Sequence, residues 1–157
     1  MADVIVYVDG FNLYYGSLKR TPYKCLDLGR LYGHFLTHSV SMALTGVTPT
    51  QRVWEDKTEE KGSDVNLASH LVRDAFRAAF QVAVLITNDS DLAEPVRIVR
   101  QELNLPVGVL NPHQHHSAEL KRIATFVKRI RQSDLVASQF AAVLNDAKGA
   151  FHKPPSW

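Results

Sequence analysis

Three runs of apolar residues, rich in β-branched side chains, predict the strands of a sheet. They are Val4–Val8, Val82–Thr87 and Pro106–Leu110, and polar or turn-forming residues follow each of them. Because apolar residues follow one another within each run, instead of alternating with polar ones, both faces of each strand are expected to be buried. Burial on both faces is typical of a parallel sheet.

Apolar residues elsewhere recur every three or four positions, which predicts amphipathic helices. The predicted helices are Asp64–Phe80, Leu92–Leu103, Ser117–Ile130 and a last one over about Leu135–Leu144. Strands that alternate with helices favour an α/β fold, in which a mostly parallel sheet is flanked by helices and joined by right-handed crossovers.

The region from Tyr32 to Lys57 does not follow this alternation. His34–Leu44 and Arg52–Lys57 are interpreted as two strands of a hairpin, with a turn near Gly46 and Pro49. The end of the chain, from Phe151 to Trp157, has no periodicity and is predicted to be a loop.

Composition fits one folded domain. The chain has 157 residues, of which 45% are hydrophobic and 22% charged, so disorder is not expected. Cys25 is the single cysteine, which excludes an internal disulfide and a cysteine zinc site. No window approaches the roughly 18 apolar residues of a membrane span, and no signal peptide is evident. These features favour a protein of the reducing cytoplasm with no membrane partner.

The formal net charge of +2 is too small to indicate a nucleic-acid partner, but its distribution is uneven. Residues 117–157 carry seven Lys/Arg against three Asp/Glu, whereas residues 1–116 carry eleven against thirteen. The basic residues include a group near the end of the predicted fold: Lys121, Arg122, Lys128, Arg129 and Arg131. This group is either a solvated helix surface or a contact for the RNA backbone.

Four aspartates are expected to meet at one edge of the sheet. Asp9 follows the first strand, Asp89 and Asp91 follow the second, and Asp64 lies in the first turn of the helix that precedes the second. Since the carboxyl ends of parallel strands share an edge, all four carboxylates can converge there. Neighbouring carboxylates repel and raise each other's pKa, so such a cluster makes sense around a hard cation, Mg²⁺ or Mn²⁺. Phosphodiester hydrolysis by water is the reaction that this site would support.

Each aspartate also has an ordinary structural interpretation. Asp91 could cap the helix that follows it, and Asp64 could complement a helix dipole. Asn12, three residues after Asp9, could hold Asp9 or a phosphate, or simply cap a helix. It is the combination of these residues that favours a metal site.

Three motifs in this order resemble the NYN domains, relatives of the PIN domains and flap endonucleases, in particular the bacterial LabA-like branch. They are VDGFNL at residues 8–13, EKGSDV at 60–65 and TNDSDL at 87–92, and the resemblance runs over most of residues 3–130. It implies a Rossmann-like, PIN-like fold, a site for Mg²⁺ or Mn²⁺, and cleavage of RNA. By motif position, Asp9, Asp64, Asp89 and Asp91 would be catalytic and bind the metal. Asn12, Ser90 and Lys61 would support the site or bind substrate.

One departure from the family concerns a strand–helix unit that usually follows the first helix. Here Leu26–Leu31 passes almost directly into His34, so one such unit is predicted to be missing. Its absence would leave the first strand with an exposed edge, which could pair with a second copy of the chain. We expect an NYN/PIN-like domain over residues 1–132, with residues 133–157 as a C-terminal helix and tail packed on it.

Smaller features leave alternatives open. His113, His115 and His116 are interpreted as a solvated loop that could touch phosphate, in preference to a metal site. Tyr14 and Tyr15 could stack on a base or pack in the core.

The leading hypothesis is a metal-dependent endoribonuclease that acts on single-stranded or loop RNA. The alternative is a weak or inactive NYN module that binds RNA or a protein partner in regulation. A phosphatase is less favoured, because its nucleophile would need an Asp-x-Asp arrangement where this chain has Asp9-Gly10-Phe11.

Overall fold

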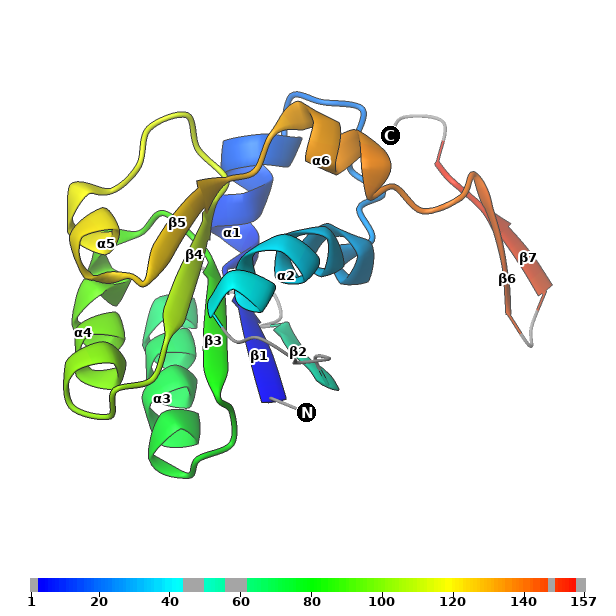
Figure 1. Cartoon of the computed structure of the whole chain (residues 1–157). Coiled ribbons are helices and arrows are strands. Elements are labelled where there is room, and N and C mark those ends of the chain that lie inside the picture. Colours follow the sequence, from blue (N-terminus) through cyan, green and yellow to red (C-terminus); the bar gives the residue numbers. More distant parts are fainter. Residues whose placement is uncertain (1–2, 44–49, 56–61, 147–148, 155–157) are drawn as a thin grey trace.

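A five-stranded parallel sheet forms the centre of the molecule (Figure 1). The computed structural model describes residues 3–43, 50–55, 62–146 and 149–154. The strand order is β2-β1-β3-β4-β5, and every neighbouring pair is parallel. The strands are β1 (Asp3–Val8), β2 (Thr50–Glu55), β3 (Val82–Ile86), β4 (Val107–Asn111) and β5 (Phe126–Arg129). The predicted α/β fold with a parallel sheet is therefore confirmed.

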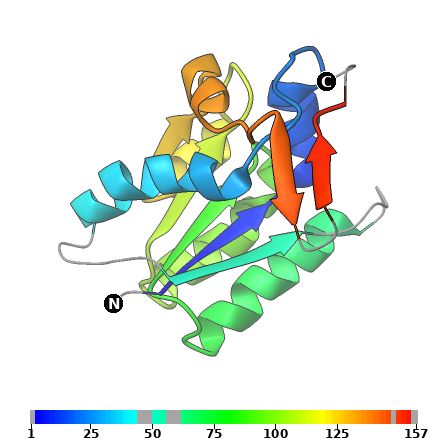
Figure 2. The ribbon, with the colours of Figure 1, turned by 90° about the vertical axis from the view of Figure 1, so that its right-hand side faces the viewer.

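Helices cover both faces of the sheet (Figures 1 and 2). One face packs against α1 (Gly10–Leu13), the π-helical turn η1 (Tyr14–Leu18), α2 (Leu28–Ala43) and α6 (Gln132–Ala137). The other packs against α3 (Ser63–Phe76), α4 (Ala93–Gln101) and α5 (Ala118–Ile123). A short 3₁₀ turn, η2 (Ser90–Leu92), precedes α4. Among the described residues, no helix has the length and apolar character needed to cross a bilayer.

Strand β1 supplies both cores because successive side chains of a strand point to opposite faces. Val4, Val6 and Val8 belong to the core under α2, whereas Ile5 and Tyr7 belong to the core under α3. This explains the continuous apolar run in the sequence.

A buried polar contact joins β1 to α3. The hydroxyl of Tyr7 donates a hydrogen bond to Oδ2 of Asp74 at 3.0 Å, and Arg73 donates to Oδ1 of the same carboxylate at 2.8 Å. Burial and the neighbouring Asp74 charge raise the pKa of Tyr7 far above its usual value, so its hydroxyl stays protonated. The partners on both carboxylate oxygens allow Asp74 to be buried.

The hairpin predicted between Tyr32 and Lys57 is wrong. Residues 34–43 are the last ten of the 16 residues of α2, and β2 pairs in parallel with β1, with Val6 opposite Val53. The edge of β1 that we predict to be open is therefore covered by β2. Sequence periodicity misses this because residues 34–44 have apolar positions compatible with either a strand or a helix.

The predicted helix Ser117–Ile130 is correct only in its first half. Helix α5 ends at Ile123, and the chain then pairs with β4 as β5. The backbone N–H of Val107 donates to Oγ1 of Thr125 at 2.9 Å, and the ring of Phe126 occupies the space that a side chain at Gly108 would need. The edge of β4 offers backbone partners that the helical spacing of apolar residues cannot reveal.

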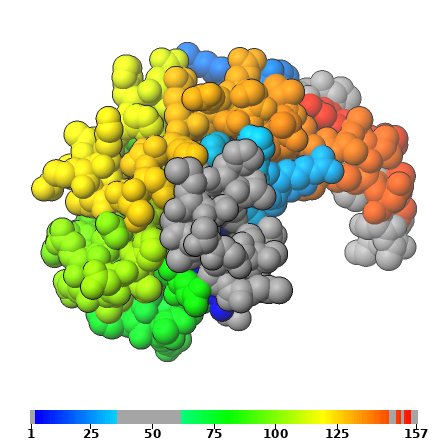
Figure 3. All heavy atoms as spheres, in the orientation of Figure 1, coloured from blue at the N-terminus to red at the C-terminus, as the bar shows by residue number. Residues whose placement is uncertain are grey.

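The predicted last helix, Leu135–Leu144, is also wrong beyond its start. Helix α6 ends at Ala137, and the chain continues beside residues 25–27, where Phe140 donates its N–H to the carbonyl of Cys25 at 2.9 Å. It then forms a hairpin of β6 (Val143–Asp146) and β7 (Gly149–His152). The hairpin projects beside the three-layer body (Figure 3). The loop predicted from Phe151 is thus a strand as far as His152, and residues 155–157 lie outside the described part.

Candidate metal centre at the carboxyl edge of the sheet

Asp9 is the buried member of the acidic cluster, and it follows β1 directly. Its Oδ1 accepts the backbone N–H of Asn12 at 2.9 Å, so the carboxylate caps α1. Its Oδ2 accepts the hydroxyl of Thr87, the residue after β3, at 3.0 Å. Only 6% of Asp9 is exposed. Both hydrogen bonds fix the orientation of the carboxylate and help to offset its burial.

Asp89 lies at the end of the neighbouring strand β3. Its backbone N–H donates to Oγ1 of Thr87 at 3.1 Å, and its own Oδ1 accepts the N–H of Asp91 at 2.9 Å. Thr87 therefore contacts both Asp9 and the backbone of Asp89. Thr87 is not among the site residues predicted from the sequence, although its place between a buried strand and Asn88-Asp89 is a recognisable signal.

Asp64 reaches the site from the start of α3. Gly62, which precedes the helix, has φ of 100°, a left-handed conformation that favours glycine. This turn places Asp64 in the first turn of α3, where Ser63 Oγ lies 3.4 Å from its Oδ1. This left-handed conformation explains why the EKGSDV motif has a glycine at position 62.

Asp9, Asp64 and Asp89 each place a carboxylate oxygen within 4.8 Å of the others. The pKa of Asp64 is raised, first by burial and then by the charges of Asp9 and Asp89, with a smaller contribution from Asp91. A raised pKa in a carboxylate cluster is the electrostatic sign that a positive charge would stabilise the ionised site.

Asp91 lies beside this group without belonging to it. It is exposed, in η2, and among the described residues the three-carboxylate group does not include it. Its charge still raises the pKa of Asp64, which places it near the cluster. Ser90 is exposed in the same turn, and Lys61 lies outside the described residues. The convergence of Asp91 with the other three is therefore looser than the sequence suggests.

The donor set fits a hard divalent cation. All three groups offer carboxylate oxygens, which Mg²⁺ and Mn²⁺ prefer. The three oxygens lie within 4.8 Å of one another, so one ion could be shared among them after the side chains move closer together. Asp9, Asp64 and Asp89 are the residues that could hold such an ion.

Asn12 joins the cluster to the loops after β3 and β4. Its Oδ1 accepts the backbone N–H of Asn88 at 3.1 Å and lies 3.0 Å from Nε2 of His113. The His113 ring packs against Gly16, where an added Cβ would lie 2.7 Å from Nε2. The Asn12 side chain therefore contacts the loops after β3 and β4, and it is Asp9, not Asn12, that caps α1. The predicted contact of Asn12 with substrate stays a prediction.

Two asparagines form hydrogen bonds with the loop that contains His113, His115 and His116, called the histidine loop below. Both Asn88 and Asn111 donate a side-chain N–H to the carbonyl of His115, each at 3.1 Å. Asn88 also accepts the N–H of Ser117 at 2.8 Å, and Asn111 Nδ2 lies 2.9 Å from Nδ1 of His116. The three histidines are predicted to form a solvated loop, and neither asparagine is predicted to hold it. The partners of Asn88 lie 27 and 29 residues away, beyond the reach of local pattern.

A basic pocket of about 450 Å³ lies further along the same edge of the sheet. Its charged and imidazole-bearing lining residues are His34, His116, Lys128, Arg129, Arg131 and Asp134. Asp134 accepts the backbone N–H of Arg131 at 2.7 Å and lies 3.8 Å from Nε2 of His34. Three permanent cations against one carboxylate make the pocket suited to anions. His116 connects it, through Asn111, to the histidine loop beside the cluster.

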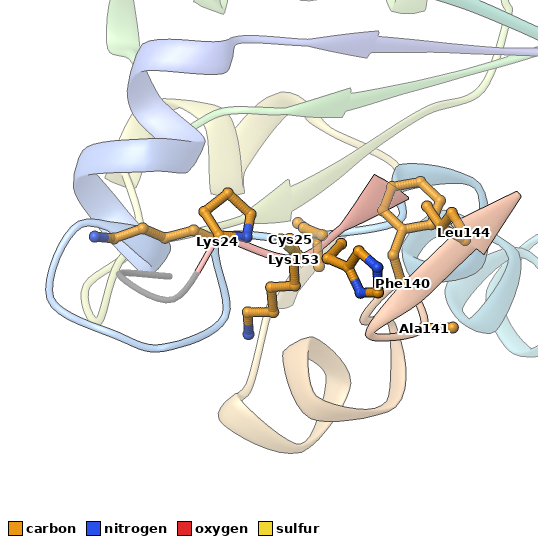
Figure 4. Close-up of a pocket in the computed structure, with 9 residues that line it drawn as sticks. Lys24, Cys25, Phe140, Ala141, Leu144 and Lys153 are labelled. Atoms are coloured by element: carbon orange, nitrogen blue, oxygen red, sulfur yellow. The ribbon is translucent and has the colours of Figure 1, made fainter. Parts of the chain in front are cut away.

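A second hollow, of about 600 Å³, lies between the β6–β7 hairpin and residues 24–26. Its walls are mostly apolar and include Phe140 and Leu144, whereas the amino groups of Lys24 and Lys153 extend on the side away from Leu144 (Figure 4). The amino group of Lys153 donates to the carbonyl of Pro22 at 3.1 Å. Its lining residues include none of the acidic cluster.

Comparisons with known proteins agree with this architecture. The NYN domain family model matches residues 3–130. A curated relative, 6-hydroxy-3-succinoylpyridine 3-monooxygenase HspA of Pseudomonas putida (strain DSM 28022 / S16), is 26% identical over 234 residues, which cover 97% of this chain and 74% of the relative. Because 234 exceeds the 157 residues of this chain, part of that alignment consists of residues with no counterpart here. A difference in length does not locate these residues, so the predicted absence of one strand–helix unit stays a prediction.

A solved structure has a similar fold at low sequence identity. It is a protein of unknown function, VPA0982, from Vibrio parahaemolyticus RIMD 2210633, with a TM-score of 0.54 and 18% identity. The match covers 83% of this chain and 94% of that one.

Proposed function

Because the chain belongs to the NYN domain family, whose relatives are nucleases, we propose that it is a metal-dependent endoribonuclease. The observation that carries the proposal is the group formed by Asp9, Asp64 and Asp89, with oxygens within 4.8 Å of one another at the carboxyl edge of the sheet. Three distant parts of the chain supply one acidic site. Such a site is suited to phosphodiester hydrolysis, in which water adds across one P–O bond.

Different residues of the chain would bind the metal ion and the RNA strand. Asp9, Asp64 and Asp89 would hold Mg²⁺ or Mn²⁺, and Asp91 would orient a water at the exposed side. When bound, such an ion lowers the pKa of a coordinated water and neutralises charge on the phosphate. Lys128, Arg129 and Arg131 of the basic pocket would bind backbone phosphates of the same strand, whose negative charge complements them.

Three predictions from the sequence stay within this proposal. Ser90 would donate to substrate from the exposed turn η2, and Lys61 would contact phosphate at the rim. The division into a domain over residues 1–132 and a packed tail also stays a prediction. A single free cysteine, Cys25, suits the reducing cytoplasm that we propose as the compartment.

The test is cleavage of a labelled oligoribonucleotide with Mn²⁺ or Mg²⁺, compared with a chelator. Wild type should cleave only with the ion, and Asp9→Asn should lose roughly 100-fold or more, because removing a ligand costs at least as much as removing a residue that supports one. Glu102→Gln, an exposed carboxylate at the end of α4, is the matched control and should cleave like wild type. Equal cleavage by wild type and Asp9→Asn would contradict the proposal.

The longer alignment of the relative favours a second candidate, a module that binds RNA or a protein partner without cleaving. Residues that this chain lacks could be part of a complete substrate groove. RNA binding by wild type, with no cleavage at any concentration of either ion, would favour this candidate.

The relative's name supports a third assay, for oxygenation of 6-hydroxy-3-succinoylpyridine, since the match covers 97% of this chain. Consumption of that compound in air with an electron donor, together with no RNA cleavage, would replace the nuclease proposal.

A further inference from the structure

Three aromatic side chains are exposed on the helix that begins at the acidic site. Phe11 and Tyr14 are each 39% exposed and Tyr15 is 56% exposed. The same helical segment, α1 and η1, is anchored by Leu13 and Leu18, which are buried in the core under α2. The aromatic residues are thus held on a fixed segment while their rings face solvent.

The rings form one arranged surface, which we call the aromatic face. Phe11 and Tyr15 are nearly parallel, with an interplanar angle of 7° and centroids 6.3 Å apart. Tyr14 meets Tyr15 edge-on, with centroids 5.3 Å apart. The amino group of Lys19 lies 4.4 Å from the centroid of the Tyr15 ring. The face therefore offers flat apolar rings beside one positive charge.

The π-helical turn η1 places Lys19 relative to these rings. The backbone N–H of Lys19 donates to the carbonyl of Tyr14 at 2.8 Å, five residues earlier, which is the hydrogen bond of a π-helix. Such turns occur often at functional sites. Here it brings Lys19 over Tyr15.

The aromatic face begins within one helical turn of the acidic cluster. Asp9 caps α1, and Phe11 and Asn12 are in its first turn. A strand with its phosphate at the cluster would have its neighbouring bases close to these rings. Planar rings bind nucleobases by stacking, which does not depend on base identity, and a base inside a duplex cannot offer its face in this way.

We propose that the aromatic face, Phe11, Tyr14 and Tyr15 with Lys19, stacks against unpaired bases of single-stranded RNA and so selects unpaired segments as substrate. The inference rests on the proposed function for its choice of nucleic acid. Tyr15 carries most of the stacking, because it is the most exposed of the three and contacts both other rings and Lys19.

The test measures RNA binding in the full-length Asp89→Asn variant, so that cleavage does not intervene. Three fluorescent ligands of equal charge are compared by anisotropy: a single-stranded oligoribonucleotide, the same backbone with abasic positions, and a short hairpin of equal length. Tyr15→Ala, added to Asp89→Asn, should weaken binding of the single strand by roughly tenfold, as expected for losing one stacked base. Binding of the abasic strand should not change, and Tyr15→Phe should bind like the parent.

Phe76→Ala is the matched control, because Phe76 is also exposed, at 62%, but lies at the far end of α3 from Asp64. It should leave binding of all three ligands unchanged. Circular dichroism melting of each variant checks that the fold is kept.

Several outcomes would overturn the inference. These are equal losses on abasic and normal strands, equal losses with Phe76→Ala, hairpin binding as tight as single-strand binding, or a change of oligomeric state with Tyr15→Ala and no change in RNA binding. The last result would assign the face to a second copy of the chain. Base-dependent binding without cleavage by wild type would support the aromatic face while contradicting the hydrolase, so the two failures are distinguishable.

Discussion

The side-chain oxygen of Thr87 lies 3.0 Å from Oδ2 of Asp9, and its hydroxyl donates the hydrogen bond between them. The same oxygen accepts the backbone N–H of Asp89 at 3.1 Å. One hydroxyl therefore joins the ends of β1 and β3 where two of the three clustered carboxylates lie. Replacing a residue that orients a metal ligand in this way typically lowers ion affinity or activity roughly 10- to 100-fold.

Replacing Thr87 with valine should therefore weaken Mn²⁺ binding. The side chain keeps its shape but loses the donor to Asp9, so affinity should fall roughly 10- to 100-fold. Isothermal titration calorimetry with Mn²⁺ measures the change. Thr87→Ser keeps the hydroxyl and should stay close to wild type, and unchanged affinity in Thr87→Val would show that the contact does not orient the ligand.

The raised pKa of Asp64 predicts that stability depends on pH in a definite direction. An acid whose pKa is higher in the folded than in the unfolded state adds stability below the unfolded value, about 3.9 for Asp. That stability is lost as the pH rises through the higher folded value. Without metal, Asp64→Asn should therefore melt at a higher temperature than wild type at neutral pH, and the difference should disappear in acid.

Adding Mn²⁺ should reverse the order of the two melting temperatures, so that wild type melts above Asp64→Asn. Wild type binds the ion in its native state and gains stability from it, whereas Asp64→Asn has lost a ligand and gains less. Differential scanning calorimetry at two pH values, with and without the ion, measures all four conditions. If metal-free Asp64→Asn melts at a lower temperature than metal-free wild type at neutral pH, repulsion among the carboxylates does not destabilise the wild type.

Asp89 and Asp91 should differ in their effect although they are two residues apart. Asp89 belongs to the three-carboxylate group and Asp91 lies outside it. Asp91→Asn should lower RNA cleavage by roughly 10- to 100-fold, the usual cost of a supporting residue, and Asp89→Asn by more. Mn²⁺ affinity separates them further, because it should remain nearly unchanged in Asp91→Asn. Equal loss of ion binding in both variants would place Asp91 among the ligands.

The pairing of β5 with β4 can be tested at Gly108. A Cβ there would lie 2.1 Å from Cζ of Phe126, so Gly108→Ala should lower the free energy of unfolding by about 1–3 kcal/mol through overpacking. Phe126→Leu should relieve part of that cost, giving a coupling of about 0.5–3 kcal/mol in a double-mutant cycle. Urea denaturation gives both values.

Gly33→Ala in α2 is the control for Gly108→Ala, because a Cβ there meets open space. It should be stabilising by about 0.5–1 kcal/mol, since alanine loses less backbone freedom in a helix than glycine does. Additive effects of Gly108→Ala and Phe126→Leu would contradict the packing of Phe126 on Gly108.

Elements that depend on local pattern could be predicted from the amino-acid sequence alone. Strands β1, β3 and β4 are continuous apolar runs, and α3 and α4 have helical spacing, so both features are visible within a few residues. Asp9 and Asp89 could be predicted to meet, because each ends a parallel strand, and parallel strands end at one edge.

Features that depend on a distant partner are set only in the folded chain. Residues 126–129 form a strand and not a helix because the edge of β4 supplies their hydrogen bonds. Thr87 contacts Asp9, and Asn12 contacts Asn88 and His113, over separations of 76 residues or more. Periodicity reports only which face of an element is apolar, whereas a hydrogen bond across the fold depends on where the other group has been placed. For that reason the acidic residues of the site could be predicted from the sequence, and the contacts that orient them could not.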